Sequence, residues 1–300
     1  MKHLLVLAAL SALVMLPPVA QATSAPGHQA RPVLVAAHRG GAMHRPENTL
    51  AAFSHAQAVG ADILELDIVM TADDQLVVYH DATIHPGICQ PDAGSAVVAG
   101  PIRALTAAQI GEFDCGSQVR DIYDVAGYQP VPGARIPTLE SVLAAFAQSG
   151  LHFYAETKVP RPVDGVADVD PQRFAAGIEA LVRKYGLEAR FVLQSSDYRT
   201  LDAMRGLNGQ VTTCLLGAHH WGHRDFAGML KRHDAACILL RDTVVDAGVV
   251  RQLQADGVQV YSEVIDTPAQ WQRYLDLGVD VIFTNHPEGA ITFLREQGRR

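Results

Sequence analysis

Residues 33–69 read VLVAAHRGGAMHRPENTLAAFSHAQAVGADILELDIV. The apolar run Val33–Ala37 precedes a helical segment at Thr49–Val59, which stops at Gly60 before a second apolar run at Ile63–Val69. A strand, a helix and a strand of these lengths predict a βαβ unit, in which a crossover helix joins two parallel strands.

The same alternation continues through most of the chain. Further candidate strands are Leu76–His80, Phe153–Thr157, Phe191–Gln194, Val211–Leu216, Ala236–Leu240, Gln259–Glu263 and Val281–Thr284. Further candidate helices are Leu139–Gln148, Pro171–Tyr185, Tyr198–Met204, Ala247–Asp256 and Ala269–Leu277. Repeated strand–helix units predict an α/β fold, and we favour a (β/α)8 TIM-type barrel. An open doubly wound sheet is the alternative, but no G-x-G-x-x-G follows the first strand.

The expected barrel is somewhat irregular. The candidate strands are one too many, and the gap from Val69 to Leu76 is too short for a crossover helix. Residues 82–137 break the strand–helix pattern, so we predict an insertion after the third strand. Residues 23–300 are then expected to form a single barrel domain.

Composition excludes several classes of protein. The chain has 300 residues, of which 48% are hydrophobic and 19% are charged, so intrinsic disorder is excluded. Four cysteines are too few for a disulfide scaffold. The formal net charge of −8 argues against a nucleic acid as partner, because phosphate backbones bind basic surfaces.

The N-terminus has the pattern of a secretory signal. Lys2 precedes the apolar run Leu4–Leu16, and the small-residue triplet Ala20-Gln21-Ala22 follows. A run of about 13 residues is shorter than the roughly 20 needed to span a bilayer. We therefore expect residues 1–22 to be a cleaved signal peptide, the mature protein to be periplasmic or secreted, and no stable membrane insertion.

Export would place the four cysteines in an oxidising compartment. Cys89 and Cys115 flank a stretch rich in Gly, Pro and Ala, which they could staple. Cys214 and Cys237 lie in apolar runs and are expected to be plain buried residues. All three pairings of four cysteines remain open.

Charged residues interrupt two of the apolar strands at alternate positions. Glu65 and Asp67 share one face of their strand, and Glu156 and Lys158 share one face of another. The alternative interpretation is that these strands have a solvated face, which fits an antiparallel sheet better than a barrel. Ionised groups inside a barrel need counter-charges or a metal.

The three carboxylates would form an oxygen-only site, which suits one divalent cation, Ca²⁺ or Mg²⁺. Positive charge for an anionic substrate comes from Arg39, after the first strand, and from Lys158. His38 and His80 lie at predicted strand ends, where barrel enzymes carry their chemistry. Two histidines can serve as general base and general acid, so the whole set favours hydrolysis of a phosphate ester.

At these residues the sequence resembles the glycerophosphodiester phosphodiesterase family. The blocks that carry the resemblance are His38-Arg39-Gly40, Pro46-Glu47-Asn48-Thr49, Glu65-Leu66-Asp67, His80-Asp81, Ile136-Pro137-Thr138-Leu139-Glu140 and Glu156-Thr157-Lys158. Their order and spacing agree over most of residues 33–158.

The resemblance implies a TIM-type barrel that hydrolyses glycerophosphodiesters to an alcohol and glycerol 3-phosphate with a divalent metal. The resemblance implies that His38 and His80 are the acid/base pair. It implies Glu65, Asp67 and Glu156 as metal ligands, and Arg39 and Lys158 as contacts to the phosphate. Glu47 has three open roles: contact with the metal, contact with the substrate, or ordering of the loop before Asn48-Thr49. Gln194 ends its strand and is either a pocket residue that binds substrate or a polar core residue.

The second half departs from the family pattern. Thr284-Asn285-His286-Pro287 stands where the family often has Thr-Asp-x-Pro, and Val260-Tyr261-Ser262-Glu263 stands where a strand with Trp is usual. The contacts to the glycerol and the leaving group are therefore left open. A further cluster, His219, His220, Trp221 and His223, has no acid at ligand spacing, which favours a surface or substrate-facing loop over a second metal site.

Two other functions remain open at this point. A phospholipase of related barrel architecture, sphingomyelinase D-like or phosphoinositide-specific, also uses paired histidines and a carboxylate-bound metal. A non-catalytic exported binding protein could keep the barrel, although every predicted catalytic position holds a competent residue. The sequence leaves open the alcohol moiety, the identity of the metal and the oligomeric state.

Overall fold

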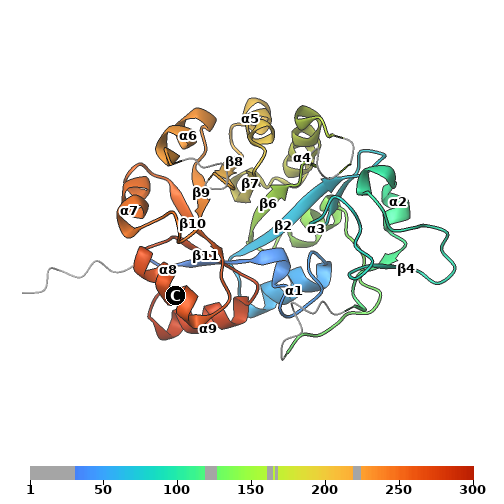
Figure 1. Ribbon diagram of the computed structural model, residues 1–300, viewed down its shortest axis with the longest axis horizontal. Coiled ribbons are helices and arrows are strands. Elements are labelled where there is room, and N and C mark those ends of the chain that lie inside the picture. Colours follow the sequence, from blue (N-terminus) through green and yellow to red (C-terminus); the bar gives the residue numbers. More distant parts are fainter. Residues whose placement is uncertain (1–30, 119–126, 161–164, 166–167, 219–223) are drawn as a thin grey trace, which may run out of the picture. The chain divides into compact units, whose positions relative to one another are not determined.

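Eight parallel strands close into a barrel in the computed structural model, which describes residues 31–118, 127–160, 165, 168–218 and 224–300 (Figure 1). The barrel strands are β1 (Leu34–Ala37), β2 (Ile63–Met70), β6 (His152–Thr157), β7 (Phe191–Ser195), β8 (Thr212–Leu215), β9 (Cys237–Leu240), β10 (Gln259–Val264) and β11 (Val281–Thr284). The ring is closed because β1 pairs in parallel with both β2 and β11. The predicted TIM-type barrel is confirmed.

Helices follow the barrel strands and surround them (Figure 1). They are α1 (Leu50–Val59), α3 (Leu139–Phe146), α4 (Pro171–Tyr185), α5 (Tyr198–Leu207), α6 (Phe226–His233), α7 (Ala247–Ala255), α8 (Pro268–Leu277) and α9 (Pro287–Glu296). Local chemistry sets their ends: Thr49 caps the start of α1, where its side chain accepts a hydrogen bond from the Ala52 N–H, and Gly60 ends it with φ of 89°.

The surplus candidate strand, predicted at Leu76–His80, is not part of the barrel ring. β3 (Leu76–Val78) runs antiparallel to β2, with Met70 opposite Leu76 and Ile68 opposite Val78. β2 is long enough to extend past the barrel rim, and β3 folds back along this extension. The expected irregularity near the second and third strands is therefore a hairpin, which needs no crossover helix.

The described part of residues 82–137 forms a small layer beside the barrel. It contains the helix α2 (Ala107–Ile110) and the antiparallel pair β4 (Gln90–Pro91) and β5 (Phe113–Asp114). Its side chains form a hydrophobic cluster with Val69, Val77 and Tyr79, which come from the β2–β3 hairpin and the residue after it. A disulfide joins Cys89 to Cys115 across a sequence separation of 26 residues, as the flanking positions suggested.

The second cysteine pair corrects an expectation. Cys214 and Cys237 are buried, as predicted, but they are joined in a disulfide rather than left as plain thiols. They lie opposite each other on the neighbouring strands β8 and β9, with Cα atoms 4.5 Å apart. That separation is within disulfide reach, and the sequence alone could not show that these two strands would be neighbours.

Removal of the Cys89–Cys115 disulfide should destabilise the protein and leave its chemistry intact. A Cys89→Ser/Cys115→Ser variant loses the constraint on a loop of about 26 residues, and we expect the free energy of unfolding to fall by roughly 3 kcal/mol. Denaturant unfolding measures this change, and kcat/KM at 25 °C is the companion measurement. A variant that lost turnover while its unfolding midpoint stayed at the wild-type value would contradict the prediction.

Alternation along the strands separates an inner barrel layer from an outer one. On β2, Leu64, Leu66 and Ile68 pack into the main hydrophobic core with the surrounding helices, whereas Ile63 belongs to the cluster inside the barrel. Glu65 and Asp67 are in phase with Ile63 and point inward. Among the described residues, no helix combines the length and apolar character that a membrane span requires.

Candidate active site

The turn after β1 has an unusual backbone conformation, which places polar groups of His38 and Arg39 at the site. In the short 3₁₀ helix η1 (His38–Gly40), Arg39 has φ of 51°, a left-handed value that non-glycine residues rarely adopt. Gly40 follows with φ of 81°, and a Cβ at this position would lie 2.7 Å from the Cβ of Ala52. The strained turn lets the Arg39 backbone N–H donate to Glu65 Oε2 at 2.8 Å.

A cavity of about 280 Å³ opens at the carboxyl ends of the barrel strands. Seven of the nine predicted site residues line it: His38, Arg39, Glu65, His80, Glu156, Lys158 and Gln194. The other two, Asp67 and Glu47, lie directly behind this wall and contact Arg39. The fold therefore brings together residues that are far apart in the sequence.

Three carboxylates converge at the base of this cavity. Glu65 and Asp67 come from β2 and Glu156 from the neighbouring β6, where it lies opposite Asp67. All three are buried, and one ligand atom of each lies within 4.8 Å of the others. The interpretation that these strands have a solvated face is wrong, because every residue of β2 is buried, as is every residue of β6 after His152.

Two cations neutralise most of this negative charge. Lys158 Nζ lies 3.1 Å from Asp67 Oδ1 and 2.8 Å from Glu156 Oε2. Arg39 Nε lies 3.4 Å from Asp67 Oδ2. Three acids against two cations leave one formal negative charge, so the site favours a bound cation.

The acids differ in their tendency to ionise. Burial and the neighbouring Asp67 raise the pKa of Glu65 well above its usual value. Burial opposes ionisation of Asp67 as well, but Lys158 and Arg39 outweigh it and hold the pKa of Asp67 well below its usual range. Burial would also lower the pKa of Lys158, yet Asp67 and Glu156 raise it, so this side chain stays charged.

The remaining polar groups hold the acids in place. Gln194 Nε2 donates to Glu65 Oε1 at 3.2 Å, so Gln194 is both buried and on the cavity wall. Its own Oε1 is buried without a hydrogen-bond partner in the described structure. Asn48 Nδ2 donates to Asp67 Oδ2 at 2.8 Å. Glu47 pairs with Arg39 at 3.0 Å, which favours the loop-ordering role among the three considered for it.

This donor set fits a hard divalent cation. All three converging groups are carboxylates, and the unpartnered amide oxygen of Gln194 lies beside them as a neutral oxygen donor. Neither sulfur nor imidazole is among these groups. The set supports Ca²⁺ or Mg²⁺ as a class and does not distinguish between them.

A hydrogen-bond chain fixes the tautomer of His38. Asn285 Nδ2 donates to Asp266 Oδ2 at 2.9 Å, and a carboxylate can only accept, so the Asn285 amide oxygen must face the other way. That oxygen lies 2.7 Å from His38 Nδ1. Nδ1 therefore carries the proton, and Nε2 keeps the lone pair. Burial, with Arg39 adding to it, lowers the pKa of His38 to about 3, so the ring is neutral near pH 7.

His80 reaches the cavity from a different direction than predicted. It follows β3, which is not a barrel strand, but the hairpin returns to the rim, where the Tyr79 N–H donates to the Asp67 carbonyl at 3.0 Å. His80 Nδ1 lies 2.7 Å from Asp81 Oδ1. The carboxylate orients the ring and can compensate the charge of its protonated form.

Two charged residues on the opposite wall were missing from the sequence prediction. Arg241 follows β9 and Glu263 lies near the end of β10, and their Nε and Oε2 atoms are 3.3 Å apart. Tyr274 donates its hydroxyl to Glu263 at 2.8 Å. Their places at strand ends were a usable signal, because that face carries barrel active sites. The histidine cluster at residues 219–223 lies outside the described residues.

Comparisons with known proteins agree with this geometry. The model of the glycerophosphoryl diester phosphodiesterase family matches residues 38–289. A glycerophosphodiester phosphodiesterase of Bacillus subtilis is 27% identical over 267 residues, which cover 85% of this chain and 84% of that protein.

Solved structures share the fold. A crystal structure from Silicibacter pomeroyi DSS-3 has a TM-score of 0.80 at 24% identity and covers 91% of this chain and 96% of that one. An Oleispira antarctica phosphodiesterase, solved in complex with the product sn-glycerol-3-phosphate, has a TM-score of 0.72 at 20% identity and covers 88% and 97% of the two chains.

Proposed function

The chain belongs to the glycerophosphoryl diester phosphodiesterase family, and we propose that its cavity carries out that chemistry with one divalent cation and two histidines. The reaction is hydrolysis of a glycerophosphodiester to an alcohol and glycerol 3-phosphate. The observation that carries this proposal is the trio of buried carboxylates beneath a cavity that both histidines line. A bound cation would polarise the phosphoryl oxygens and offset their charge.

Arg39 and Lys158 are the groups that we propose to bind the phosphate. Both line the cavity, and both are already fixed by ion pairs with Asp67. This fixing means that little side-chain freedom is lost when an anion binds. Gln194 orients Glu65, and Glu47 orients Arg39, so we assign both to positioning.

The hydrogen bonds support different roles for the two histidines. His38 is neutral with Nε2 as acceptor, which suits a general base that takes the proton of an attacking hydroxyl, from water or from the glycerol. His80 is paired with Asp81, which suits a general acid that protonates the departing alkoxide. The proton removed on one side is thus matched by one supplied on the other.

Product analysis tests this function directly. The purified protein is incubated with a panel of glycerophosphodiesters, with and without a chelator, and products are followed by phosphorus NMR. We expect glycerol 3-phosphate as the phosphorus product and loss of turnover with chelator. Release of a cyclic phosphate would support a related-barrel phospholipase instead. Absence of turnover on every substrate with added Ca²⁺ or Mg²⁺ would favour the non-catalytic binding protein.

Replacement of Asn285 by Asp should shift the pH dependence. A general base works only when deprotonated, so kcat/KM falls as the pH drops below its pKa. Because the pKa of His38 is about 3, the wild-type acidic limb should lie well below 6.5, the value for an ordinary histidine. In Asn285→Asp, a carboxylate beside Nδ1 favours the charged ring and raises that pKa, so the limb should move to higher pH. An unmoved limb would exclude His38 as the base. Gln57→Glu, which converts an exposed amide on α1 to an acid, is the control.

We also propose that the protein is exported after cleavage behind Ala22. The apolar run after Lys2 and the two disulfides support this, because disulfides persist in oxidising compartments. N-terminal sequencing of the protein recovered from the periplasm or medium should begin at Thr23. Recovery only from the cytoplasm, with Met1 retained, would contradict the proposal.

A further inference from the structure

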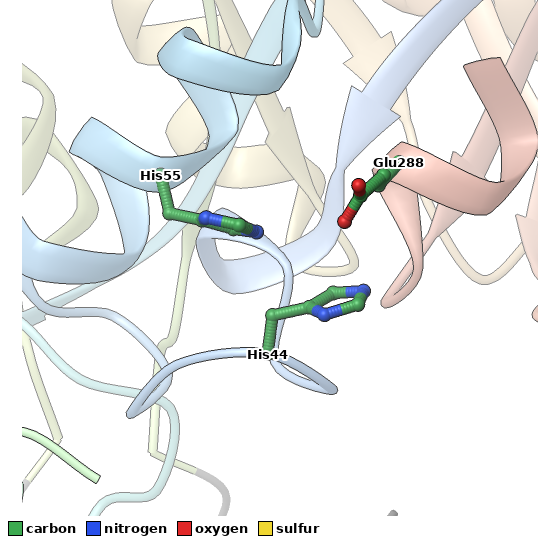
Figure 2. A group of neighbouring side chains, drawn as sticks. All are labelled: His44, His55 and Glu288. Carbon is green, nitrogen blue, oxygen red and sulfur yellow. The ribbon is translucent and has the colours of Figure 1, made fainter. Parts of the chain in front are cut away.

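A second group of side chains of metal-ligating types lies outside the cavity (Figure 2). His44 is in the loop before α1, His55 is on α1, and Glu288 is in the first turn of α9. The three come together because β1 pairs with β11, which places α1 and α9 side by side. One ligand atom of each lies within 4.8 Å of the others, and in Figure 2 both rings and the carboxylate face a common space.

Ordinary packing does not account for His55. Its Nε2 atom is buried and has no hydrogen-bond partner in the described structure. A buried polar atom without a partner costs free energy, so such atoms are rare unless they serve a purpose. The His44 ring lies against it, with ring centroids 5.2 Å apart.

The histidines are in the protonation state that a metal requires. Burial lowers the pKa of His44 to about 4, and the neighbouring His286 and His55 add to the effect. Burial also lowers the pKa of His55, with Arg45 contributing. Both rings are therefore neutral near pH 7 and offer a lone pair.

His286 supplies the contact that usually accompanies a ligating histidine. Its Nδ1 atom lies 2.6 Å from Nε2 of His44. One ring must donate to the other, and the contact orients the His44 ring. Metal binding through Nδ1 of His44 requires the tautomer in which His44 Nε2–H donates to His286, since a ligating histidine almost always donates its second ring N–H to an acceptor.

We propose that His44, His55 and Glu288 form a binding site for a transition-metal ion of the zinc type. Two imidazoles and one carboxylate are a ligand set that Zn²⁺ and its neighbours accept, whereas Ca²⁺ and Mg²⁺ prefer oxygen ligands alone. The site is thus chemically distinct from the carboxylate trio, and it is independent of the proposed catalytic mechanism. Zinc–ligand bonds of 2.0–2.2 Å require ligand atoms roughly 3.4 Å apart. The ligand atoms, which lie within 4.8 Å of one another, must therefore move closer when the metal binds. The side chain of Glu288 is exposed and long enough to make this movement.

Cobalt(II) is a suitable probe, because its visible absorption reports low-coordinate nitrogen and oxygen ligation. The full chain is prepared with Glu65→Gln, which impairs the oxygen site, stripped with chelator, and titrated with Co²⁺ and then with competing Zn²⁺. We expect one Co²⁺ per chain with d–d bands of a four- or five-coordinate ion, and displacement of Co²⁺ by Zn²⁺.

Two variants locate the site. His55→Ala and Glu288→Gln should each weaken Co²⁺ binding at least about tenfold. This is the smallest loss expected even for a side chain that only hydrogen-bonds a metal ligand. His85→Ala removes an exposed histidine elsewhere and should bind as the parent does. Circular dichroism and the thermal midpoint verify folding, and Glu288→Gln alters only an exposed side chain. Absence of the bands in the parent, or bands that persist at unchanged affinity in both variants, would overturn the proposal.

Discussion

Replacing any of Glu65, Asp67 or Glu156 by Ala should lower cation affinity and phosphodiesterase activity together. Each loses one of three carboxylates whose ligand atoms lie within 4.8 Å of one another. Loss of a side chain that only hydrogen-bonds a metal ligand already lowers metal affinity or activity about 10- to 100-fold. Loss of a ligand itself should therefore reduce kcat/KM at least about 100-fold. Calorimetric titration with Ca²⁺ and Mg²⁺, beside activity assays, measures both quantities.

The three variants should also differ from one another. Asp67 anchors Arg39, Lys158 and Asn48, so its removal should disturb phosphate binding in addition to the cation. Gln194→Ala removes the hydrogen bond to Glu65 and a neutral oxygen donor but no carboxylate, and we expect a smaller loss. Glu296→Gln changes an exposed acid on α9 and is the matched control. Full activity of all three Ala variants after chelator treatment would show that the carboxylates do not hold a required metal.

Cation binding should release protons. Burial beside Asp67 raises the pKa of Glu65, so the protonated form of this group is favoured without the cation. A bound cation favours the ionised form, and the affinity should therefore rise with pH. Titrations in buffers with different ionisation enthalpies measure the released protons, and the release should be reduced in Glu65→Gln.

Local sequence determines the barrel elements well, because each is specified by neighbouring residues. Val281–Thr284 and Pro171–Tyr185 were predicted with the bounds that the structure shows, since one is a short apolar run and the other begins with a proline and ends at Gly186. The helices α6 and α9 were not predicted. α9 follows β11 after only two intervening residues, and its N-cap residue His286 makes no side-chain cap hydrogen bond. Pro287 at its first position was a usable start signal that the sequence prediction missed.

Pairing between distant segments was beyond the reach of sequence patterns. Leu76–Val78 has the composition of a barrel strand, and only its antiparallel pairing with β2 excludes it from the ring. The Cys214–Cys237 disulfide likewise depends on which strands are neighbours. The same limit applies in the site. Glu65 and Asp67 were evident as charges at alternate positions of an apolar strand, whereas the contact of Asn285 with His38 spans 247 residues.

The proposed mechanism depends most directly on the two histidines. His38→Ala and His80→Ala should each reduce the rate on a natural glycerophosphodiester by at least about 100-fold, the lower range for general acid–base catalysis. Neither ring is among the groups proposed to hold the cation, so cation affinity should change little. The thermal midpoint verifies that each variant is folded at the assay temperature. His152→Ala, which removes an exposed histidine at the start of β6, is the matched control.

A substrate with an activated leaving group separates the two roles. The nitrophenolate of a nitrophenyl phosphodiester departs without protonation. This substrate therefore relieves the need for a general acid but not for a general base. The Asn285–Asp266 chain leaves His38 Nε2 as an acceptor, and His80 is the histidine proposed as the acid. This substrate should therefore restore much of the rate of His80→Ala and little of that of His38→Ala. Rescue of His38→Ala alone would reverse the assignment. Near-wild-type rates for both variants on the natural substrate would exclude a mechanism that uses two histidines, since neither proton transfer would then need a side chain at position 38 or 80.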